Sequence, residues 1–233
     1  MIKEAIILAG GLGTRLRPVV TDVPKCMAPV AGKPFLVFII DFLVNQGITS
    51  FIYALGFKGD MIKDFINNQY PKLDNRFSFE EEPLGTGGAI KLACKFCNDE
   101  NILVLNGDTI FKINLEELTS FHTKHDAHCT LCLKPMHDFN RYGVVELNDD
   151  NSIKNFKEKK SYVTGLINGG VYALNKNIFL KEKLPDKFSF ENDYLQTYFN
   201  KGKMYAVIQD KYFIDIGIPE DYQKAQTDFT VIK

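Results

Sequence analysis

Apolar and polar positions divide the first half of the chain into alternating short strands and helices. Apolar runs at 5–9, at 51–55 and within 101–106 have the length and composition of buried strands. Apolar positions recur at helical spacing over 34–46 and 58–68, and 77–81 forms a further strand-like segment. Such alternation is typical of βαβ units, so we predict an α/β fold with a mainly parallel sheet that is covered on both faces.

The pattern of the second half is less regular. Residues 114–125 have the spacing of a capped helix, and from residue 129 the chain changes to shorter strand-like segments, including 141–146 and 153–159. A last apolar strand ends at Asp215, and Pro219 stands at the favoured first position of a final helix. The pattern contains no internal repeat, low-complexity stretch or linker, so we predict a single domain over 1–233.

The apolar run 5–9 leads directly into a glycine-rich loop, Gly10-Gly11-Leu12-Gly13-Thr14-Arg15. Glycines allow backbone amides to approach an anion closely, and the arginine adds a positive charge suited to phosphate. Neither common phosphate motif fits, because Leu16 replaces the third glycine of the dinucleotide fingerprint, and Gly32-Lys33 is followed by proline. The loop is interpreted as a phosphate cradle, and a plain strand-to-helix turn is the alternative.

Two spaced motifs resemble a known family. The run 8–16, LAGGLGTRL, followed by 24–29, PKCMAP, is similar to the signature of the sugar-phosphate nucleotidyltransferases, and the similarity extends over nearly the whole chain. The resemblance implies a Rossmann-like three-layer sandwich with a mixed sheet, a nucleotide-binding part at about 1–112 and a sugar-binding part at about 113–233. Cys26 departs from the family, which usually has proline after Lys25.

The resemblance assigns nucleotide contacts to three segments. The second glycine loop, EPLGTGG at 82–88, corresponds to the family's base and ribose loop, and a helix N-terminus capped by Thr86 is the alternative. Asn106 and Gly107 end the strand 101–106, where ligands of open α/β sheets bind. The implied nucleotide-binding residues are Leu8, Ala9, Gly10, Gly11, Gly13, Thr14, Arg15, Glu82, Leu84, Gly85, Thr86, Gly87, Asn106 and Gly107.

Two aspartates are the implied metal ligands. Asp108 follows the strand 101–106, and Asp215 lies in the frame Asp-x-Gly-x-Pro, where Ile218 replaces the family's usual threonine. A turn-forming Asn-Gly-Asp is the alternative for the first. Carboxylates that hold one hard cation against a triphosphate fit Mg²⁺, which is the cofactor that we expect.

The implied sugar-phosphate-binding residues lie in the second half of the chain. The motifs Phe-x-Glu-Lys at 156–159 and NGGVY at 168–172 are similar to the family's sugar motifs. A solvated charged turn is the alternative for 157–160. The residues assigned by resemblance are Gly143, Glu158, Lys159, Asn168 and Gly169.

The implied reaction is the attack of a sugar 1-phosphate oxygen on the α-phosphorus of a nucleoside triphosphate, with release of pyrophosphate. A phosphate monoester has its second pKa near ~6, so no strong protein base is needed. In this scheme Arg15 holds the departing pyrophosphate, Lys25 balances the developing charge, and Asp108 holds the metal. The run 82–90 and the short chain resemble the bacterial D-glycero-D-manno-heptose 1-phosphate guanylyltransferases, which implies GTP and a heptose 1-phosphate as substrates.

Other readings stay open at this point. Hexose 1-phosphate guanylyl-, uridylyl- and thymidylyltransferases share the same motifs. A catalytically silent relative that binds a nucleotide-sugar is a second class, although it would not need both aspartates. A glycosyltransferase is a third, although its closely spaced Asp-x-Asp is absent and Asp149-Asp150 lies in a turn.

Composition and charge indicate which binding partners and which cell compartment to expect. The chain has 233 residues, 45% hydrophobic and 24% charged, and a formal net charge of −1, which gives no reason to expect nucleic acid or a membrane surface as partner. The longest apolar run is too short to cross a bilayer, and no secretory signal precedes the glycine loop, so we expect a cytoplasmic protein. A homo-oligomer is compatible with this pattern.

The cysteines and histidines also invite a metal interpretation. Cys94-x-x-Cys97 and Cys129-x-x-Cys132 mimic a zinc ribbon, but the first pair is expected at the helix 89–96 and the second on opposite faces of a strand. We therefore interpret all four as buried apolar thiols. His122, His125 and His128 are interpreted as surface or interface groups rather than ligands.

Overall fold

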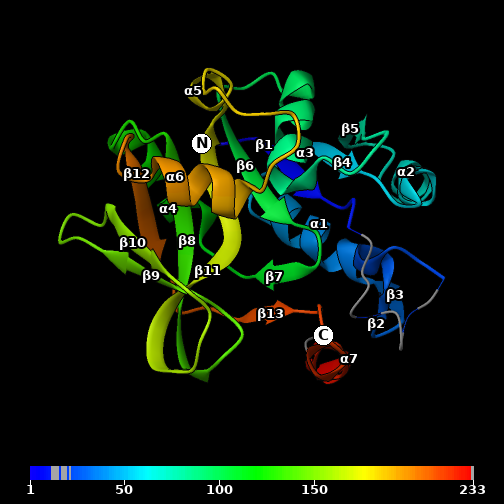
Figure 1. Cartoon of the computed structure of the whole chain (residues 1–233). Helices are drawn as coiled ribbons and strands as arrows, with labels where there is room; N and C mark the ends of the chain where they lie inside the picture. Colours follow the sequence, from blue (N-terminus) through cyan, green and yellow to red (C-terminus); the bar gives the residue numbers. More distant parts are fainter. Residues whose placement is uncertain (12–15, 17–19, 21, 232–233) are drawn as a thin grey trace.

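A seven-stranded mixed sheet with the order β12-β8-β11-β6-β1-β4-β5 forms the centre of the computed structural model, which describes residues 1–11, 16, 20 and 22–231 (Figure 1). β1 pairs in parallel with β4 and β6, and β4 with β5. β11 runs antiparallel between β6 and β8, and the edge strand β12 is parallel to β8. The predicted α/β fold with a mainly parallel mixed sheet is confirmed.

The strands are β1 (Glu4–Leu8), β2 (Pro29–Val30), β3 (Lys33–Pro34), β4 (Ser50–Leu55), β5 (Asp74–Phe79), β6 (Asn101–Asn106), β7 (Thr109–Phe111), β8 (Cys129–Phe139), β9 (Val144–Leu147), β10 (Ile153–Lys157), β11 (Tyr162–Asn175), β12 (Met204–Ile208) and β13 (Phe213–Asp215). The helices are α1 (Phe35–Asn45), α2 (Gly59–Gln69), α3 (Gly85–Ala93), α4 (Leu115–Lys124), α5 (Lys176–Phe179), α6 (Gln196–Tyr198) and α7 (Pro219–Val231), together with the shorter or irregular segments η1 (Lys25–Met27), η2 (Cys94–Phe96) and η3 (Phe190–Leu195).

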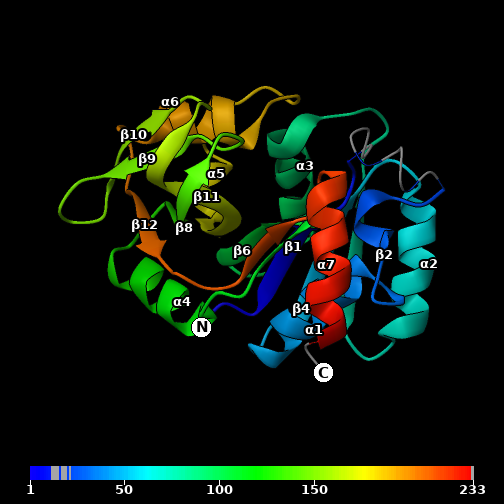
Figure 2. The same cartoon turned by 90° about the horizontal axis from the view of Figure 1, so that it is seen from below.

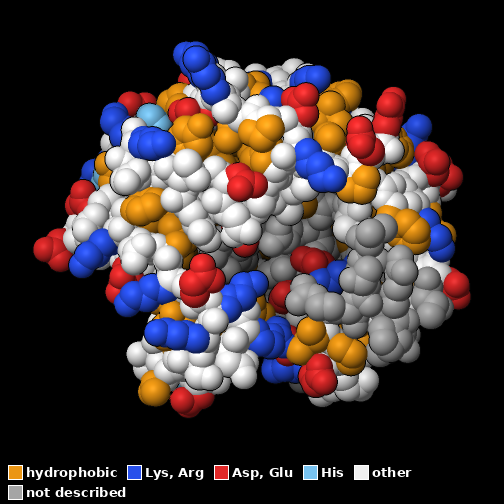
Figure 3. Space-filling view, viewed as in Figure 1, with side chains coloured by type: hydrophobic (Ala, Val, Ile, Leu, Met, Phe, Trp, Pro, Cys, Tyr) orange, Lys and Arg blue, Asp and Glu red, His pale blue; other side chains and the backbone are white. Residues whose placement is uncertain are grey.

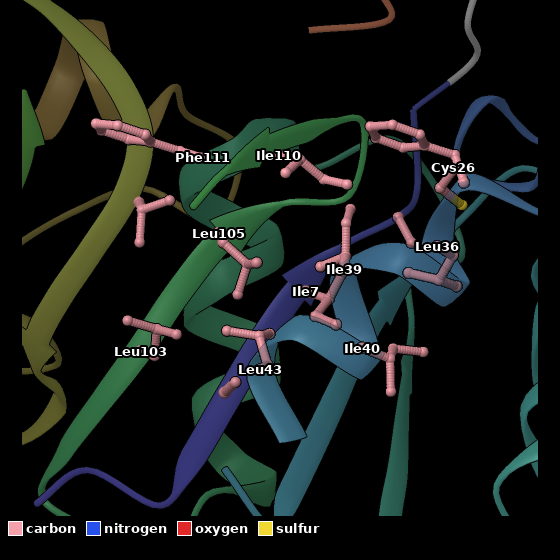
Figure 4. Close-up of a cluster of buried hydrophobic side chains, with 14 of the residues drawn as sticks. Ile7, Cys26, Leu36, Ile39, Ile40, Leu43, Leu103, Leu105, Ile110 and Phe111 are labelled. Atoms are coloured by element: carbon pink, nitrogen blue, oxygen red, sulfur yellow. The ribbon is translucent and has the colours of Figure 1, made fainter. Parts of the chain in front are cut away.

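Helices cover both faces of the sheet, which gives three layers. One apolar cluster joins β1 through Ile7 to α1, α2, α4 and α7, and the second joins β1 through Ile6 to α3, α5 and η3. Neighbouring residues of a strand point to opposite faces, so a strand with both faces buried needs an unbroken apolar run. Figure 4 shows the first cluster, where Ile39 and Leu43 of α1 pack over Ile7 and Leu105.

Most predicted elements lie within a few residues of their expected bounds, but two predicted starts and one alternative interpretation were wrong. β5 begins at Asp74 rather than at 77, because its pairing with β4 runs from Ser50 onward. α3 begins at Gly85, four residues before the expected start, and Cys97 lies just beyond η2. Thr86 does not cap α3; its Oγ1 accepts a hydrogen bond from the Phe190 amide at 2.9 Å.

The cysteines are buried free thiols, and Cys129 and Cys132 pack into different clusters on the two faces of β8, as predicted. His122 corrects the expectation of a surface group, because it is 1% exposed. Its Nδ1 lies 2.9 Å from Thr130 Oγ1 and its Nε2 lies 3.1 Å from Asn101 Oδ1, so the ring joins α4 to β8 and β6. Among the described residues, no helix is long and apolar enough to cross a membrane.

Candidate active site

The carboxyl ends of β1 and β6 are held together by the backbone. The Gly107 amide donates to the Leu8 carbonyl at 2.9 Å, and a Cβ on Gly107 would lie only 2.7 Å from that oxygen. Only glycine permits this approach, which places Asn106 and Asp108 beside the first glycine loop. A cavity of about 640 Å³ opens at this edge of the sheet. Its described lining consists of Leu8, Gly10, Gly11, Ala54, Gly56, Phe57, Glu80, Glu81, Glu82, Pro83, Gly85, Thr86, Ala89, Asn106 and Asp108.

The second glycine loop is fixed by the segment before η3. Phe188 donates its amide to the Leu84 carbonyl at 2.9 Å and accepts from the Gly87 amide at 3.0 Å. Gly85 has a φ of +73°, and a Cβ on it would lie 2.5 Å from the Phe188 carbonyl oxygen. A side chain is excluded there, so the loop packs directly against Phe188, and Gly85 and Thr86 line the cavity.

Glu80 lies in the wall between the two glycine loops. Its Oε2 accepts from the Leu84 amide at 3.0 Å, and its Oε1 lies where a Cβ on Gly10 or Gly56 would come within 2.8 or 2.6 Å. The glycines thus leave room for a carboxylate in the cavity wall. A carboxylate has about four lone-pair positions, and the Leu84 amide uses one of them.

Lys25, Asp108 and Asp215 form the charged centre of the site. The Lys25 ammonium contacts Asp108 Oδ2 and lies 3.4 Å from Asp215 Oδ1. Asp215 lies opposite Thr109 in the β7–β13 ladder, and the Ile216 amide donates to the Asp108 carbonyl at 3.0 Å. This short ladder explains why two aspartates so distant in the chain meet. Figure 3 shows the corresponding face hollowed near its centre, with acidic and basic side chains next to each other in the hollow.

The two carboxylates of this centre share a single ammonium. Burial raises the pKa of the Asp215 carboxyl, and the charge of Asp108 raises it further, whereas Lys25 and the Gly217 amide, 2.7 Å from Oδ1, lower it. Two carboxylates that share one ammonium have the oxygen chemistry that Mg²⁺ prefers, so the residues present fit such an ion. Burial raises the pKa of the neighbouring Cys26 thiol to about 12, which keeps it neutral and unsuited to nucleophilic attack.

A second cavity of about 390 Å³ opens on the Asp215 side of Lys25, lined by residues 136–142 and 213–215 with Asp221 and Lys224. Arg141 donates from Nη2 to Asp221 Oδ2 at 2.6 Å and to the Tyr142 hydroxyl at 2.9 Å. Burial raises the pKa of Tyr142, and the charge of Asp215 adds to the shift. Since Asp108 lines the first cavity and Asp215 the second, Lys25 lies at the boundary between them.

The residues assigned to sugar phosphate lie beside β9 and β10 and within β11. Gly143 is packed so closely that a Cβ would lie 2.4 Å from the Lys157 carbonyl oxygen, and Gly169 packs in the same way against the Phe111 ring. Glu158 and Lys159 are exposed after β10. The Asn168 amide group donates to the Tyr172 hydroxyl at 2.9 Å, and its Oδ1 accepts from the Gly170 amide at 3.1 Å.

The structure divides the sequence-based assignments into three groups. Gly13, Thr14 and Arg15 lie outside the described residues. The first cavity brings together Leu8, Gly10, Gly11, Glu82, Gly85, Thr86, Asn106 and Asp108. Within the described part of the chain, four further residues assigned to the nucleotide are not in the lining of that cavity: Ala9, Leu84, Gly87 and Gly107.

Gly87 is directed elsewhere, because a Cβ on it would meet the Phe188 ring at 2.1 Å. Sequence reasoning gave no role to Glu80, Ala54 and Gly56, which also line the cavity. Ala54 and Gly56 have no functional group in their side chains, so the sequence gives no sign of their position in the site. The Glu80-Glu81-Glu82 run is a signal that could have found Glu80.

Comparisons with known proteins agree with this arrangement. The family model for nucleotidyl transferases matches residues 4–231. The chain is 51% identical to the D-glycero-alpha-D-manno-heptose 1-phosphate guanylyltransferase of Aneurinibacillus thermoaerophilus, with 96% of each chain covered. It is 48% identical to the protein of the same name from Campylobacter jejuni, over 94% of this chain and 96% of that one.

Among solved structures, the crystal structure of HddC from Yersinia pseudotuberculosis complexed with GMP-PN is similar, with a TM-score of 0.88 and 40% identity. The match covers 98% of this chain and 100% of that one. The similarity therefore includes both cavities and the strands that separate them.

Proposed function

The chain belongs to the nucleotidyl transferase family, and on this premise we propose that it transfers a guanylyl group from GTP to D-glycero-α-D-manno-heptose 1-phosphate. The products are GDP-heptose and pyrophosphate. The observation that carries the proposal is the full-length similarity to guanylyltransferases of this kind, combined with two cavities that meet at one charged centre.

The reaction forms one bond and breaks one. A phosphate oxygen of the sugar 1-phosphate attacks the α-phosphorus of the triphosphate, and the bond from that phosphorus to the β-phosphate bridging oxygen breaks. The nucleophile is already largely ionised near pH 7, because the second pKa of a phosphate monoester is ~6. The protein therefore acts mainly by positioning the two phosphates and by balancing their charge.

Lys25, Asp108 and Asp215 supply that charge balance. Asp108 and Asp215 would hold Mg²⁺, which neutralises phosphate charge when it is bound. The Lys25 ammonium lies within reach of both cavities and would move from the carboxylates to the phosphate oxygens. Backbone amides at Gly11 and Gly13 would contact the triphosphate, and Arg15 would hold the departing pyrophosphate.

Glu80 is suited to recognise guanine. The base presents an N1–H and a 2-amino group on one edge, and a carboxylate can accept from both. Glu80 lies in the wall of the first cavity, and packing against Gly10 and Gly56 together with the Leu84 amide holds its position. Uracil and thymine offer a single N–H on the corresponding edge, which makes them weaker partners for a carboxylate.

The heptose 1-phosphate would bind on the Asp215 side. Tyr142 lines the second cavity and is followed directly by Gly143, whose backbone is one of the assigned sugar contacts. Glu158 and Asn168 would bind sugar hydroxyls, Lys159 would bind the sugar's phosphate, and Gly169 follows Asn168 directly in β11. We further propose that the reaction takes place in the cytoplasm, where nucleoside triphosphates are available.

Pyrophosphate release tests the proposal. Purified protein with Mg²⁺ is crossed with GTP, ATP, CTP, UTP and dTTP against a panel of sugar 1-phosphates that includes the manno-heptose and mannose. We expect turnover with GTP and the heptose phosphate to exceed every other pair by at least about tenfold. Faster turnover with mannose 1-phosphate would replace the sugar and keep the reaction. Nucleotide-sugar binding without any turnover would instead identify a silent binder.

A further inference from the structure

The loop that carries Lys25 continues into a short hairpin formed by β2 and β3. Lys25 lies in η1, and the Ala28 amide donates to the Lys25 carbonyl at 3.1 Å. Ala31 and Gly32 turn the hairpin with φ values of +46° and +81°. The position of the Lys25 backbone therefore depends on what holds this hairpin.

Helix α7 holds it with two side chains. The Gln226 amide group donates from Nε2 to the Pro29 carbonyl at 2.7 Å and accepts at Oε1 from the Ala31 amide at 2.9 Å. The Tyr222 hydroxyl donates to the same Pro29 carbonyl at 2.6 Å. One planar amide thus satisfies a donor and an acceptor of the turn, as a neighbouring strand would.

The same helix begins beside the other half of the charged centre. Pro219 follows Asp215 closely in the chain, and the Gly217 amide between them donates to Asp215 Oδ1 at 2.7 Å. In Figure 2, α7 lies in front of α1 with β2 close to it. The first turn of α7 is therefore linked to Asp215, and its later turns are linked to the loop of Lys25.

Three residues of α7 pack into the core, and one of them, Tyr222, also hydrogen-bonds the hairpin. Tyr222, Ala225 and Phe229 are buried in the first apolar cluster, and the Phe229 ring lies 4.5 Å from that of Phe38. Gln226 is only half-buried. Its two hydrogen bonds to the hairpin define the geometry of the turn, whereas the apolar contacts around it account for most of the attachment of α7.

We propose that Gln226 is a positioning residue for Lys25. It fixes the β2–β3 hairpin against α7, so that the Lys25 backbone keeps one position from which the ammonium reaches the phosphates in the transition state. The inference rests on the charge-balancing role proposed above for Lys25. It adds that this role depends on a side chain at the other end of the chain that touches neither substrate.

Replacement of Gln226 by leucine tests the inference, because leucine keeps the volume and removes both hydrogen bonds. We expect kcat for pyrophosphate release to fall about tenfold, with KM for both substrates changed less than twofold, since positioning affects the transition state more than binding. Gln223→Leu is the matched control, because Gln223 is exposed on the same helix and should keep full activity.

Hydrogen exchange separates positioning from general destabilisation. In Gln226→Leu, peptides covering 24–38 should exchange faster, while peptides from β1, β6 and α3 keep their native rates. Native exchange over 24–38, or an unchanged kcat, would overturn the inference. Faster exchange throughout the protein would also overturn it, because the residue would then act on the fold as a whole.

A double-mutant cycle links the effect to Lys25. In a Lys25→Arg background the loss caused by Gln226→Leu should shrink to less than twofold, because the guanidinium reaches the phosphates from a different position. Equal losses in both backgrounds would overturn the inference. If Lys25→Gln, which removes the charge, is as active as the native protein, the proposed role of Lys25 itself fails, which is a distinct result.

Discussion

The ammonium of Lys25 contacts the carboxylate of Asp108, a residue 83 positions further along the chain, and joins it to Asp215. The contact is largely shielded from solvent, since the Lys25 side chain is 11% exposed and that of Asp108 is 32%. One cation thus balances two carboxylates at the boundary of two cavities. When substrates bind, we expect a metal ion to take the place of the Lys25 ammonium beside the carboxylates, and the ammonium to contact the phosphates. The first two predictions follow from this exchange.

Asp108→Asn should reduce Mg²⁺-dependent pyrophosphate release by at least about a hundredfold, because it removes one of the two carboxylates that we propose as metal ligands. The thermal midpoint should change by no more than a few degrees, since Lys25 keeps Asp215 as a partner. Asp149→Asn, in an exposed turn, is the control and should match the native rate. A fully active Asp108→Asn protein would contradict the assignment of the two aspartates.

Lys25→Gln should lose turnover and yet bind a divalent cation more tightly when no nucleotide is present. The ammonium competes for the same carboxylate oxygens, so its removal leaves two negative charges without a counterion. Titration with Mn²⁺, followed by the electron paramagnetic resonance signal of the free ion, should show a Kd at least about tenfold lower than in the native protein. Lys33→Gln, exposed on the same hairpin, should bind Mn²⁺ as the native protein does. Equal Kd values for Lys25→Gln and the native protein would show that Lys25 does not compete with the cation.

Glu80→Gln should narrow the preference for GTP over inosine triphosphate, which lacks the 2-amino group. A carboxylate accepts from that amine, whereas the amide of glutamine can place a donor against it. We expect the native ratio of kcat/KM for the two nucleotides to be about tenfold or more, and to fall toward one in the variant. An unchanged ratio would assign base recognition to another residue of the cavity.

Replacement by alanine should affect stability at one glycine, Gly87, and nucleotide binding at another, Gly11. Gly87→Ala places a Cβ 2.1 Å from the Phe188 ring and should lower the free energy of unfolding by roughly 1–3 kcal/mol. No described atom lies within 4 Å of a Cβ on Gly11. Gly11→Ala should therefore leave the stability within about 0.5 kcal/mol and raise KM for the nucleotide. Urea unfolding and initial rates on both variants check the pair.

His122 should make the protein less stable in mild acid. Burial lowers the pKa of its imidazole to about 4, from an ordinary value of 6.5, and Asn101 Oδ1 requires the Nε2–H of the neutral ring. The unfolded state binds a proton below pH 6.5 that the folded state does not bind, so this contribution is complete above pH 6.5 and is lost as the pH falls toward 4. The loss is roughly 2–3 kcal/mol. In His122→Gln the free energy of unfolding should vary less between pH 6.5 and 4, and an identical slope would contradict the prediction.

The sequence predicts those parts of the fold whose stability is local. β1 and β6 are recognisable as unbroken apolar runs, and α4 has the cap that its sequence predicts, with Asn114 Oδ1 accepting from the Glu117 amide at 3.1 Å. The glycine loops and the strand ends at Asp108 and Asp215 could also be found, because their residue types are unusual at those places. The glycine loops and Asp108 lie together because strand ends at one sheet edge meet, and the β7–β13 ladder adds Asp215.

The remaining features depend on contacts between distant segments. Thr86 has the side chain of a helix cap, yet its hydroxyl serves the Phe190 amide, which no local pattern encodes. His122 is polar and was therefore expected at the surface. It is buried because both ring nitrogens have hydrogen-bond partners in two different strands. Gln226 looks like any polar residue of an exposed helix face, and its function depends on a hairpin at the opposite end of the sequence.

The attachment of α7 to the β2–β3 hairpin means that the catalytic centre is completed only when the last helix has been synthesised. Lys25 leaves the ribosome early, but the partners that fix its loop are synthesised almost 200 residues later, Gln226 being 195 positions beyond Ala31. A nascent chain can complete the strands of its first half and still lack a finished catalytic centre. Loss of the last helix by proteolysis would therefore silence the enzyme while most of its sheet remained intact.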